Sequence, residues 1–249
     1  DGQDAAAVAT INSNFGVWGD SSGTYLYIGE NDGRKVRRVE MATNIISTFA
    51  GSGTAGTNDG VAATSATFES VNNVWGDSMN NIFICDAGNN VVRKVDVSTG
   101  IVNVFAGRFG LAGGADGVLA TNAKLNSPVQ AYGDSIGNVY IVDKLGNRVR
   151  RVDGTTNIIT KYAGTGEVGY HDGDGDKTSA QFRFPQGIFV DSTGSVFVAD
   201  QDNHIVRKIS SAGIISNVVG TAETSGSNCD GVDATACLLN EPYSIWADP

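Results

Sequence analysis

The chain alternates between short hydrophobic runs and polar turns along its whole length. In the run Val139–Val142, and again in Val196–Val198, β-branched residues alternate with aromatic or other apolar ones. Runs of about 4–7 residues bounded by Gly, Asn, Asp and Ser are typical of β-strands. No stretch shows the hydrophobic period of a long helix. The pattern therefore predicts an all-β protein.

The predicted strands form a repeat marked by an aromatic residue that is followed two positions later by Asp. Asp20 and Asp77 are 57 positions apart, and the same spacing separates each later pair. Each repeat holds four predicted strands, and the third carries an Arg between aliphatic residues. Four short antiparallel strands in a repeat of this length predict the blade of a β-propeller. The marked pairs are Trp18/Asp20, Trp75/Asp77, Tyr132/Asp134, Phe189/Asp191 and Trp246/Asp248.

The spacing divides the chain, residues 1–249, into a single propeller array. Its four complete repeats cover about 15–71, 72–128, 129–185 and 186–243, and 244–249 is the first strand of a further blade. Part of each repeat is a long connector, whose Ala-rich middle is expected to form one short helical turn. Either further blades outside this sequence or open strand edges that pair with another copy would complete the array. The second arrangement would produce a filament.

The segment 132–187 resembles the secreted NHL-repeat propellers, and the last complete repeat matches them most clearly. There, Asn203 and His204 followed by the aliphatic Ile205 match the letters that give the family its name. The resemblance covers about 15–248 and implies a β-propeller fold. Family members bind proteins, RNA, peptides or ligands, and a few are lyases or hydrolases, so the resemblance implies no particular activity.

Composition and charge narrow the possible partners. The chain has 33 Gly, 4 Pro and a formal net charge of −10, which describes an ordered, turn-rich and acidic protein. An acidic surface repels phosphate backbones, so nucleic acid is not an expected partner. The Arg and Lys pairs of the third strands are interpreted as a solvated strand edge. No apolar run approaches the roughly 20 residues that span a bilayer, so membrane insertion is not expected.

Acidic residues recur at two positions of every repeat. One set follows the marker aromatic: Asp20, Asp77, Asp134 and Asp191. The other set ends the second strand: Glu30, Asp86, Asp143 and Asp200. Rings of carboxylates could hold a metal or act as acids and bases, but a site with one substrate breaks repeat symmetry. The favoured interpretation is that each carboxylate caps turn amides, and no catalytic residue is assigned.

The third-strand arginines have two interpretations. Arg37, Arg93, Arg150 and Arg207 are expected to pair with a neighbouring acid or with carbonyl groups of the blade. The alternative is a ring of cations that binds an anion.

Metal ligands are sparse in the sequence. The two histidines, His171 and His204, are too few for a three-histidine zinc site. Asp172, Asp174 and Asp176 alternate as in a calcium loop, but the twelfth position, where a Glu is required, is Arg183. A solvated acidic turn is the favoured interpretation, weak calcium binding is the alternative, and no other cofactor is expected.

The cysteines bear on the compartment. Cys85 occupies a small core position of its repeat. Cys229 and Cys237 lie together in the last connector, where the second repeat carries Ala115 and Ala123. The pair predicts a local disulfide and therefore an oxidising compartment. The alternative is two unrelated thiols.

These features predict a non-catalytic propeller module, extracellular or at the cell surface, that binds proteins or copies of itself. The core is expected to contain the marker aromatics Trp18, Trp75, Tyr132, Phe189 and Trp246. The alternatives are a metal-dependent propeller enzyme of the lyase or lactonase kind, and a ligand-sensing domain of a receptor.

Overall fold

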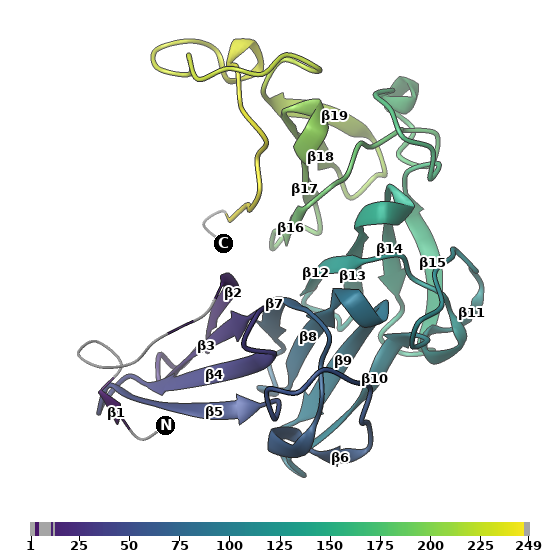
Figure 1. Ribbon diagram of the computed structural model, residues 1–249. Coiled ribbons are helices and arrows are strands. Elements are labelled where there is room, and N and C mark those ends of the chain that lie inside the picture. Colours follow the sequence, from purple (N-terminus) through teal and green to yellow (C-terminus); the bar gives the residue numbers. More distant parts are fainter. Residues whose placement is uncertain (1–2, 5–10, 12, 247–249) are drawn as a thin grey trace. The chain divides into compact units, whose positions relative to one another are not determined.

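The computed structural model describes residues 3, 4, 11 and 13–246, and these form two compact units. Unit 1 comprises Asp1–Ala112 and Ala120–Ala131, and unit 2 comprises Gly113–Leu119 and Tyr132–Pro249. Figure 1 follows the strands in chain order from purple to yellow. The strands form four antiparallel sheets, so the all-β expectation is confirmed.

Each sheet contains a blade of four consecutive strands joined by short turns. Blade 1 contains β2 (Asn14–Gly19), β3 (Tyr25–Glu30), β4 (Lys35–Glu40) and β5 (Ile45–Ala50). Blade 2 contains β7 (Val71–Gly76), β8 (Ile82–Asp86), β9 (Val91–Asp96) and β10 (Ile101–Gly107). Blade 3 contains β12 (Pro128–Gly133), β13 (Val139–Asp143), β14 (Arg148–Val152) and β15 (Ile158–Ala163). Blade 4 contains β16 (Gly187–Val190), β17 (Val196–Asp200), β18 (Ile205–Ile209) and β19 (Ile215–Val219).

The connector that precedes a blade also adds to the outer edge of that blade. In the first three sheets it contributes a two-residue strand that pairs with the last strand of the blade. In blade 4 the corresponding contact is a bridge between Asp176 and Ile214. The connector is therefore part of the blade that follows it. The edge strands are β1 (Gln3–Asp4) on β5, β6 (Val61–Ala62) on β10 and β11 (Val118–Leu119) on β15.

Short 3-10 helices complete the repeats. The helical turn expected in the Ala-rich middle of the connectors is confirmed at η1 (Ala63–Ser65), η3 (Ala120–Asn122) and η7 (Ala234–Ala236). A second set follows the second strand of a blade: η2 (Ala87–Asn89), η4 (Lys144–Gly146) and η6 (Gln201–Asn203). One more, η5 (Gly173–Gly175), lies in the connector before blade 4.

Aliphatic residues of the middle strands form the core, together with an apolar residue from each connector. In unit 1 the cluster includes Val36 of blade 1, Ile82 and Ile84 of blade 2, and Phe68 of the connector between them. Phe68 is fully buried, as are its repeat counterparts Leu125 and Phe182. These three side chains pack the connectors into the core, and the burial of their apolar area stabilises that contact.

The marker aromatics differ in burial. Phe189 is buried, whereas Trp18, Trp75 and Tyr132 are half-buried. Trp246 is 71% exposed, so the expectation that it lies in the core is wrong. The reason is that Ser244–Trp246 lies in no strand of the described chain, so no sheet covers the indole. Residues 247–249, the rest of the expected first strand with Asp248, lie outside the described residues.

Candidate functional site

In blades 1 to 4, the Asp two positions after the marker aromatic caps the turn between the first and second strands. The Asp77 Oδ1 atom accepts hydrogen bonds of 2.9 Å from the backbone N–H groups of Met79 and Asn81. Asp134 and Asp191 accept the corresponding pairs of bonds in their own turns. Asp20 accepts from the N–H of Tyr25 at 2.9 Å. These carboxylates therefore have a structural function in each blade.

The acid that ends the second strand is buried beneath the third-strand arginine. In blade 2, the Asp86 Oδ2 atom lies 3.8 Å from Nη1 of Arg93, and both side chains are fully buried. Asp86 also accepts from the N–H groups of Glu69 and Ser70 and from the amide of Asn89. Burial raises the pKa of Asp86, against the opposite effect of these hydrogen bonds. The other three pairs are Glu30/Arg37, Asp143/Arg150 and Asp200/Arg207.

The interpretation of the arginines as a solvated strand edge is wrong. The side chains of Arg93, Arg150 and Arg207 have no exposed area, and that of Arg37 is 11% exposed. Neighbours on a strand point to opposite faces, so Arg93 enters the buried face. Lys94 lies on the other face, with its Nζ atom 5.3 Å from the Phe83 ring centroid. Buried guanidinium groups in ion pairs do not form an anion-binding ring.

The buried arginines also bind the connector before their blade. Arg93 donates to the backbone O of Asn58 at 2.5 Å and to the carboxylate of Asp59 at 2.7 Å. Arg150 makes the same two contacts with Ala115 and Asp116. The contact partners belong to a recurring x-Asp-Gly triplet that the sequence interpretation did not recognise. Its members are Asp59, Asp116, Asp172 and Asp230, each followed by Gly.

Blade 4 varies this contact. Arg207 donates to the backbone O atoms of His171 at 3.1 Å and Gln181 at 2.9 Å. The carboxylate of Asp172 is exposed on the connector. In blades 2, 3 and 4 the arginine therefore holds the main chain of the connector, while the Asp contact differs among these repeats.

The residues that match the family letters are also structural. Asn203 donates to the Asp200 carboxylate and to the backbone O of Gly169. His204 has a φ of 59°, and its Nδ1 atom accepts from the N–H of Glu241 at 3.1 Å. Asn90 and Asn147 occupy the same left-handed position and accept from Ser127 and Phe184. The position of His204 thus anchors the end of the connector that follows blades 2, 3 and 4.

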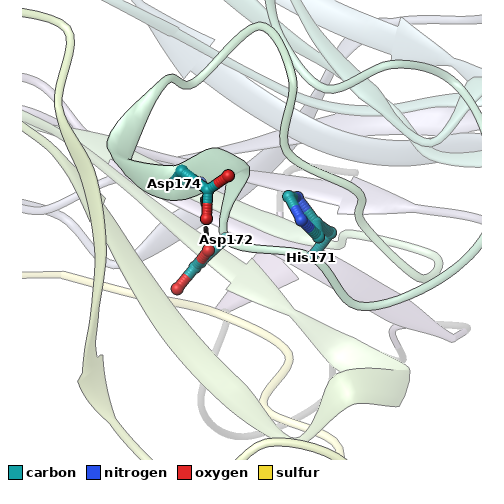
Figure 2. A group of neighbouring side chains, drawn as sticks. All are labelled: His171, Asp172 and Asp174. Atoms are coloured by element: carbon teal, nitrogen blue, oxygen red, sulfur yellow. Dashed lines mark hydrogen bonds between the residues drawn. The ribbon is translucent and has the colours of Figure 1, made fainter.

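The metal candidates are brought together only in part (Figure 2). One ligand atom each of His171, Asp172 and Asp174 lies within 4.8 Å of the others, and all three residues are exposed. Asp172 Oδ1 accepts from the Asp174 N–H at 3.1 Å, and the His171 Nδ1 atom accepts from Gly173. Asp176 lies apart from this group, because its carboxylate accepts from Thr178 and Ser179. The three grouped residues are the ones that could ligate an ion.

The cysteines fall into two classes. Cys229 and Cys237 form a disulfide, with their Cα atoms 4.5 Å apart. Cys85 is a free and buried thiol, and burial raises its pKa. The thiolate that would react with oxidants or metals is therefore suppressed at Cys85, which fits a residue of the core.

Comparisons with known proteins agree with this fold. The chain is 25% identical over 207 residues to the Arabidopsis thaliana protein SUPPRESSOR OF QUENCHING 1, chloroplastic, covering 80% of this chain and 19% of that protein. It is 26% identical over 172 residues to the Bos taurus NHL repeat-containing protein 2, covering 66% and 23%. The chain thus spans about a fifth of the length of these relatives. No protein-family model matches it.

Solved structures show the same architecture at low sequence identity. A chain of a nidogen/laminin complex matches with a TM-score of 0.61 and 13% identity, over 94% of this chain and 68% of that one. A Bacteroides thetaiotaomicron protein of unknown function matches with a TM-score of 0.59 and 19% identity, over 98% and 66%. Virginiamycin B lyase from Staphylococcus aureus matches with a TM-score of 0.53 and 14% identity, over 86% and 56%.

The fold and the buried repeat contacts define a β-propeller built of four-stranded blades. The NHL-named relatives and the repeat residues described above support an NHL-repeat β-propeller family for this chain. Within the described residues, no helix has the length and apolar character needed to cross a membrane.

Proposed function

We propose that the protein is a non-catalytic, extracellular β-propeller module that assembles with copies of itself. The observation that carries the proposal is the surface of the last connector, residues 220–246. This segment displays, in exposed form, the groups with which the earlier connectors bind a blade. A blade with the same repeat contacts is the chemically matched partner, and a second copy of the chain supplies such a blade.

The earlier connectors show what such a contact requires. A connector offers an Asp carboxylate and a main-chain carbonyl to the third-strand arginine, as Asp59 and Asn58 do for Arg93. It adds a buried apolar side chain, Phe68 in the same case. The N–H of Glu69 then donates to the acid at the end of the second strand, Asp86. Charge-assisted hydrogen bonds in a dry contact are the strong ones.

The last connector is anchored to blade 4 in the same way as the others are anchored to theirs. Gly220 donates to the backbone O of Ala234, and Thr221 donates to that of Cys237, each at 2.9 Å. Gly51 and Ser52 make the equivalent bonds to Ala63 and Ala66. This half of the contact is therefore complete, and the disulfide of Cys237 fixes it further.

The other half of the contact is exposed. The Asp230 carboxylate forms no ion pair or side-chain hydrogen bond within the described part of the chain. Val232 is 48% exposed and Trp246 is 71% exposed. Leu239, the counterpart of the buried Phe68, is half-buried. A connector that exposes both a carboxylate and apolar side chains fits a partner that brings an arginine and an aliphatic face.

Blade 1 of a second copy is the partner that fits best. Its arginine, Arg37, is the least buried of the four third-strand arginines, with 11% of its side chain exposed against none for the others. The edge of blade 1 pairs with β1 over two residues, Gln3 and Asp4. Val232 and Asp233 occupy the repeat position of this short edge strand. In the assembly they would replace β1 on blade 1 of another copy, as in domain swapping. Such a head-to-tail contact generates rings or filaments.

The extracellular location is supported by the disulfide between Cys229 and Cys237. Disulfides persist in oxidising compartments and are rare where thiols are kept reduced.

The experiment compares the masses in solution of wild type, Asp230→Ala and Asp202→Ala by size-exclusion chromatography with light scattering. Asp202 is an acid on η6 of blade 4 and serves as the matched loss of one charge. The proposal expects wild type and Asp202→Ala to form oligomers that Asp230→Ala forms less readily. Equal oligomer populations for both variants would contradict the assignment of the contact to Asp230.

A metal-dependent enzyme is the second candidate, and the grouping of His171, Asp172 and Asp174 favours it. It predicts a divalent ion in stoichiometric amount in the purified protein, lost in His171→Ala. Elemental analysis by mass spectrometry distinguishes the two candidates, since the assembly module requires no ion.

A further inference from the structure

A groove of about 500 Å³ lies along the outer edge of β10 in unit 1. One wall comes from β10 itself, with Asn103 as its exposed polar residue. The opposite side comes from the connector that follows, with Arg108, Phe109 and Leu111. Thr121 of η3 also lines the groove. Its volume falls in the range of small-ligand sites, about 300–1,000 Å³.

The edge strand leaves room for a ligand there. β6 pairs with β10 only at Ile101 and Val102. Beyond Val102, the next N–H on this edge, that of Val104, donates to Oδ2 of Asp59 at 3.0 Å. Asp59 is thereby committed on both oxygens, because its Oδ1 atom accepts from Arg93 at 2.7 Å. The acid of the groove is neutralised by the blade.

The remaining charge in the groove is positive. Arg108 is exposed, and its guanidinium forms no ion pair or hydrogen bond within the described part of the chain. The guanidinium of Arg108 is therefore available to an anionic ligand, on a chain with a net charge of −10. A guanidinium presents paired N–H donors that match a carboxylate.

An apolar wall lies beside this charge. Phe109 is half-buried, with its ring centroid 5.2 Å from the Arg93 guanidinium carbon. This contact holds the ring in place. Leu111 is 41% exposed. A fixed ring and an aliphatic side chain next to a free guanidinium form a surface with separate apolar and cationic parts.

The groove breaks the symmetry of the repeat. At the positions of Arg108 and Phe109, the other connectors carry Ser52-Gly53, Thr165-Gly166 and Thr221-Ala222. A cation that served the blade itself would be needed in each repeat, as Arg93 and its counterparts are. Arg108 serves no such purpose in the described structure.

We infer that this groove binds an organic acid with an aromatic or aliphatic body. The carboxylate pairs with Arg108, and the body lies against Phe109 and Leu111. The amide of Asn103 and the hydroxyl of Thr121 lie at the rim, where they can bind a polar substituent. The site does not depend on the assembly surface of the last connector.

The test uses ¹⁵N-labelled protein titrated with 3-phenylpropionate and followed by NMR. Saturable shifts are expected at the amides of Asn103 and of Gly107–Leu111. Two control ligands test the cationic and the apolar contact separately. 3-Phenylpropanamide has no charge, and acetate has no apolar body. Each is expected to bind about tenfold more weakly, because each loses one of the two contacts.

The protein variants complete the design. Arg108→Gln is expected to weaken 3-phenylpropionate binding about tenfold, whereas Arg183→Gln, the same loss of charge on unit 2, leaves it unchanged. Asp230→Ala should bind as wild type does, which separates this site from the assembly surface. Equal binding of the acid and the amide, or wild-type binding by Arg108→Gln, would overturn the inference.

Discussion

The indole ring of Trp18 lies directly against the backbone of Gly76, the residue that follows the marker aromatic in blade 2. A Cβ atom built on Gly76 would lie 2.4 Å from Cη2 of Trp18. The marker aromatic of one blade therefore packs on the first strand of the next blade, at a position that only glycine can occupy without displacing the ring. In unit 1 this contact couples blade 1 to blade 2.

Replacement of Gly76 tests this contact. In Gly76→Ala the new methyl group must displace the indole, and overpacking of this kind costs about 1–3 kcal/mol of unfolding free energy. Gly19→Ala is the matched control at the same repeat position, because its Cβ atom would lie no closer than 3.9 Å to Leu26. Urea denaturation measures both. Equal losses for the two variants would show that Trp18 is free to move.

The two neighbouring cations of a third strand should differ in their effect on stability. Arg93→Leu leaves Asp86 as a buried charge without its partner, so we expect a loss of about 3–5 kcal/mol. Lys94→Ala removes a partly exposed side chain, and we expect a loss of about 0–1 kcal/mol. The same denaturation assay measures both losses. A smaller loss for Arg93→Leu than for Lys94→Ala would show that the buried ion pair of Arg93 does not stabilise the blade.

The position of His204 requires a side-chain acceptor in a left-handed backbone conformation. His204→Asn should retain stability, since Asn90 and Asn147 fill this position in other blades. His204→Val loses the acceptor for the Glu241 N–H and places a β-branched residue at a positive φ, which costs about 1–3 kcal/mol. Hydrogen exchange at Glu241 reports the change directly. Protection retained in His204→Val would refute the anchoring role.

Two carboxylates of blade 4 should respond to pH with opposite signs. Burial raises the pKa of Asp200 to about 7 from an ordinary value of 3.8. Its folded form therefore holds a proton that the unfolded chain releases, and the contribution of this group to stability falls as the pH rises from about 4 to about 7. For Asp191, burial acts to raise the pKa, but hydrogen bonds from Thr193 and Ser195 lower it overall. Its contribution is present above the ordinary value and is lost as the pH falls through the folded pKa.

The measurement is the free energy of unfolding across this pH range for wild type, Asp200→Asn and Asp191→Asn. Relative to Asp200→Asn, wild type should lose stability as the pH rises. Relative to Asp191→Asn, it should gain stability as the pH rises from the acid limit. A gain with pH in the first comparison would mean that the ion pair with Arg207 outweighs burial.

The order of strands was predictable from the sequence because each strand buries one face, and alternation is a local signal. The period of the marker residues then located the blades. The placement of Arg93 was not predictable in this way, since alternation separates Arg93 from Lys94 without indicating which face is buried. Besides Asp86, Arg93 binds a second acid, Asp59, which lies in the connector 34 positions away. The recurrence of x-Asp-Gly in step with the arginines was the signal that could have found it.

The exposure of Trp246 could not be read from its repeat position either. Trp75 and Phe189 occupy the same position and are covered to different extents. The burial of a marker aromatic depends on the strands that cover it, and the identity of the residue does not indicate whether such strands are present. The grouping of the metal candidates also depended on the local fold and not on their spacing in the sequence. Asp172 and Asp174 lie near His171, whereas the carboxylate of Asp176 accepts hydrogen bonds within its own turn.

Sedimentation velocity of the purified 25.8 kDa chain across a wide range of protein concentration tests self-assembly most directly. If the protein self-assembles, the species grow heavier with concentration, up to rings or filaments, and Asp230→Ala shifts the distribution toward the monomer. A monomer at every concentration for wild type would contradict it.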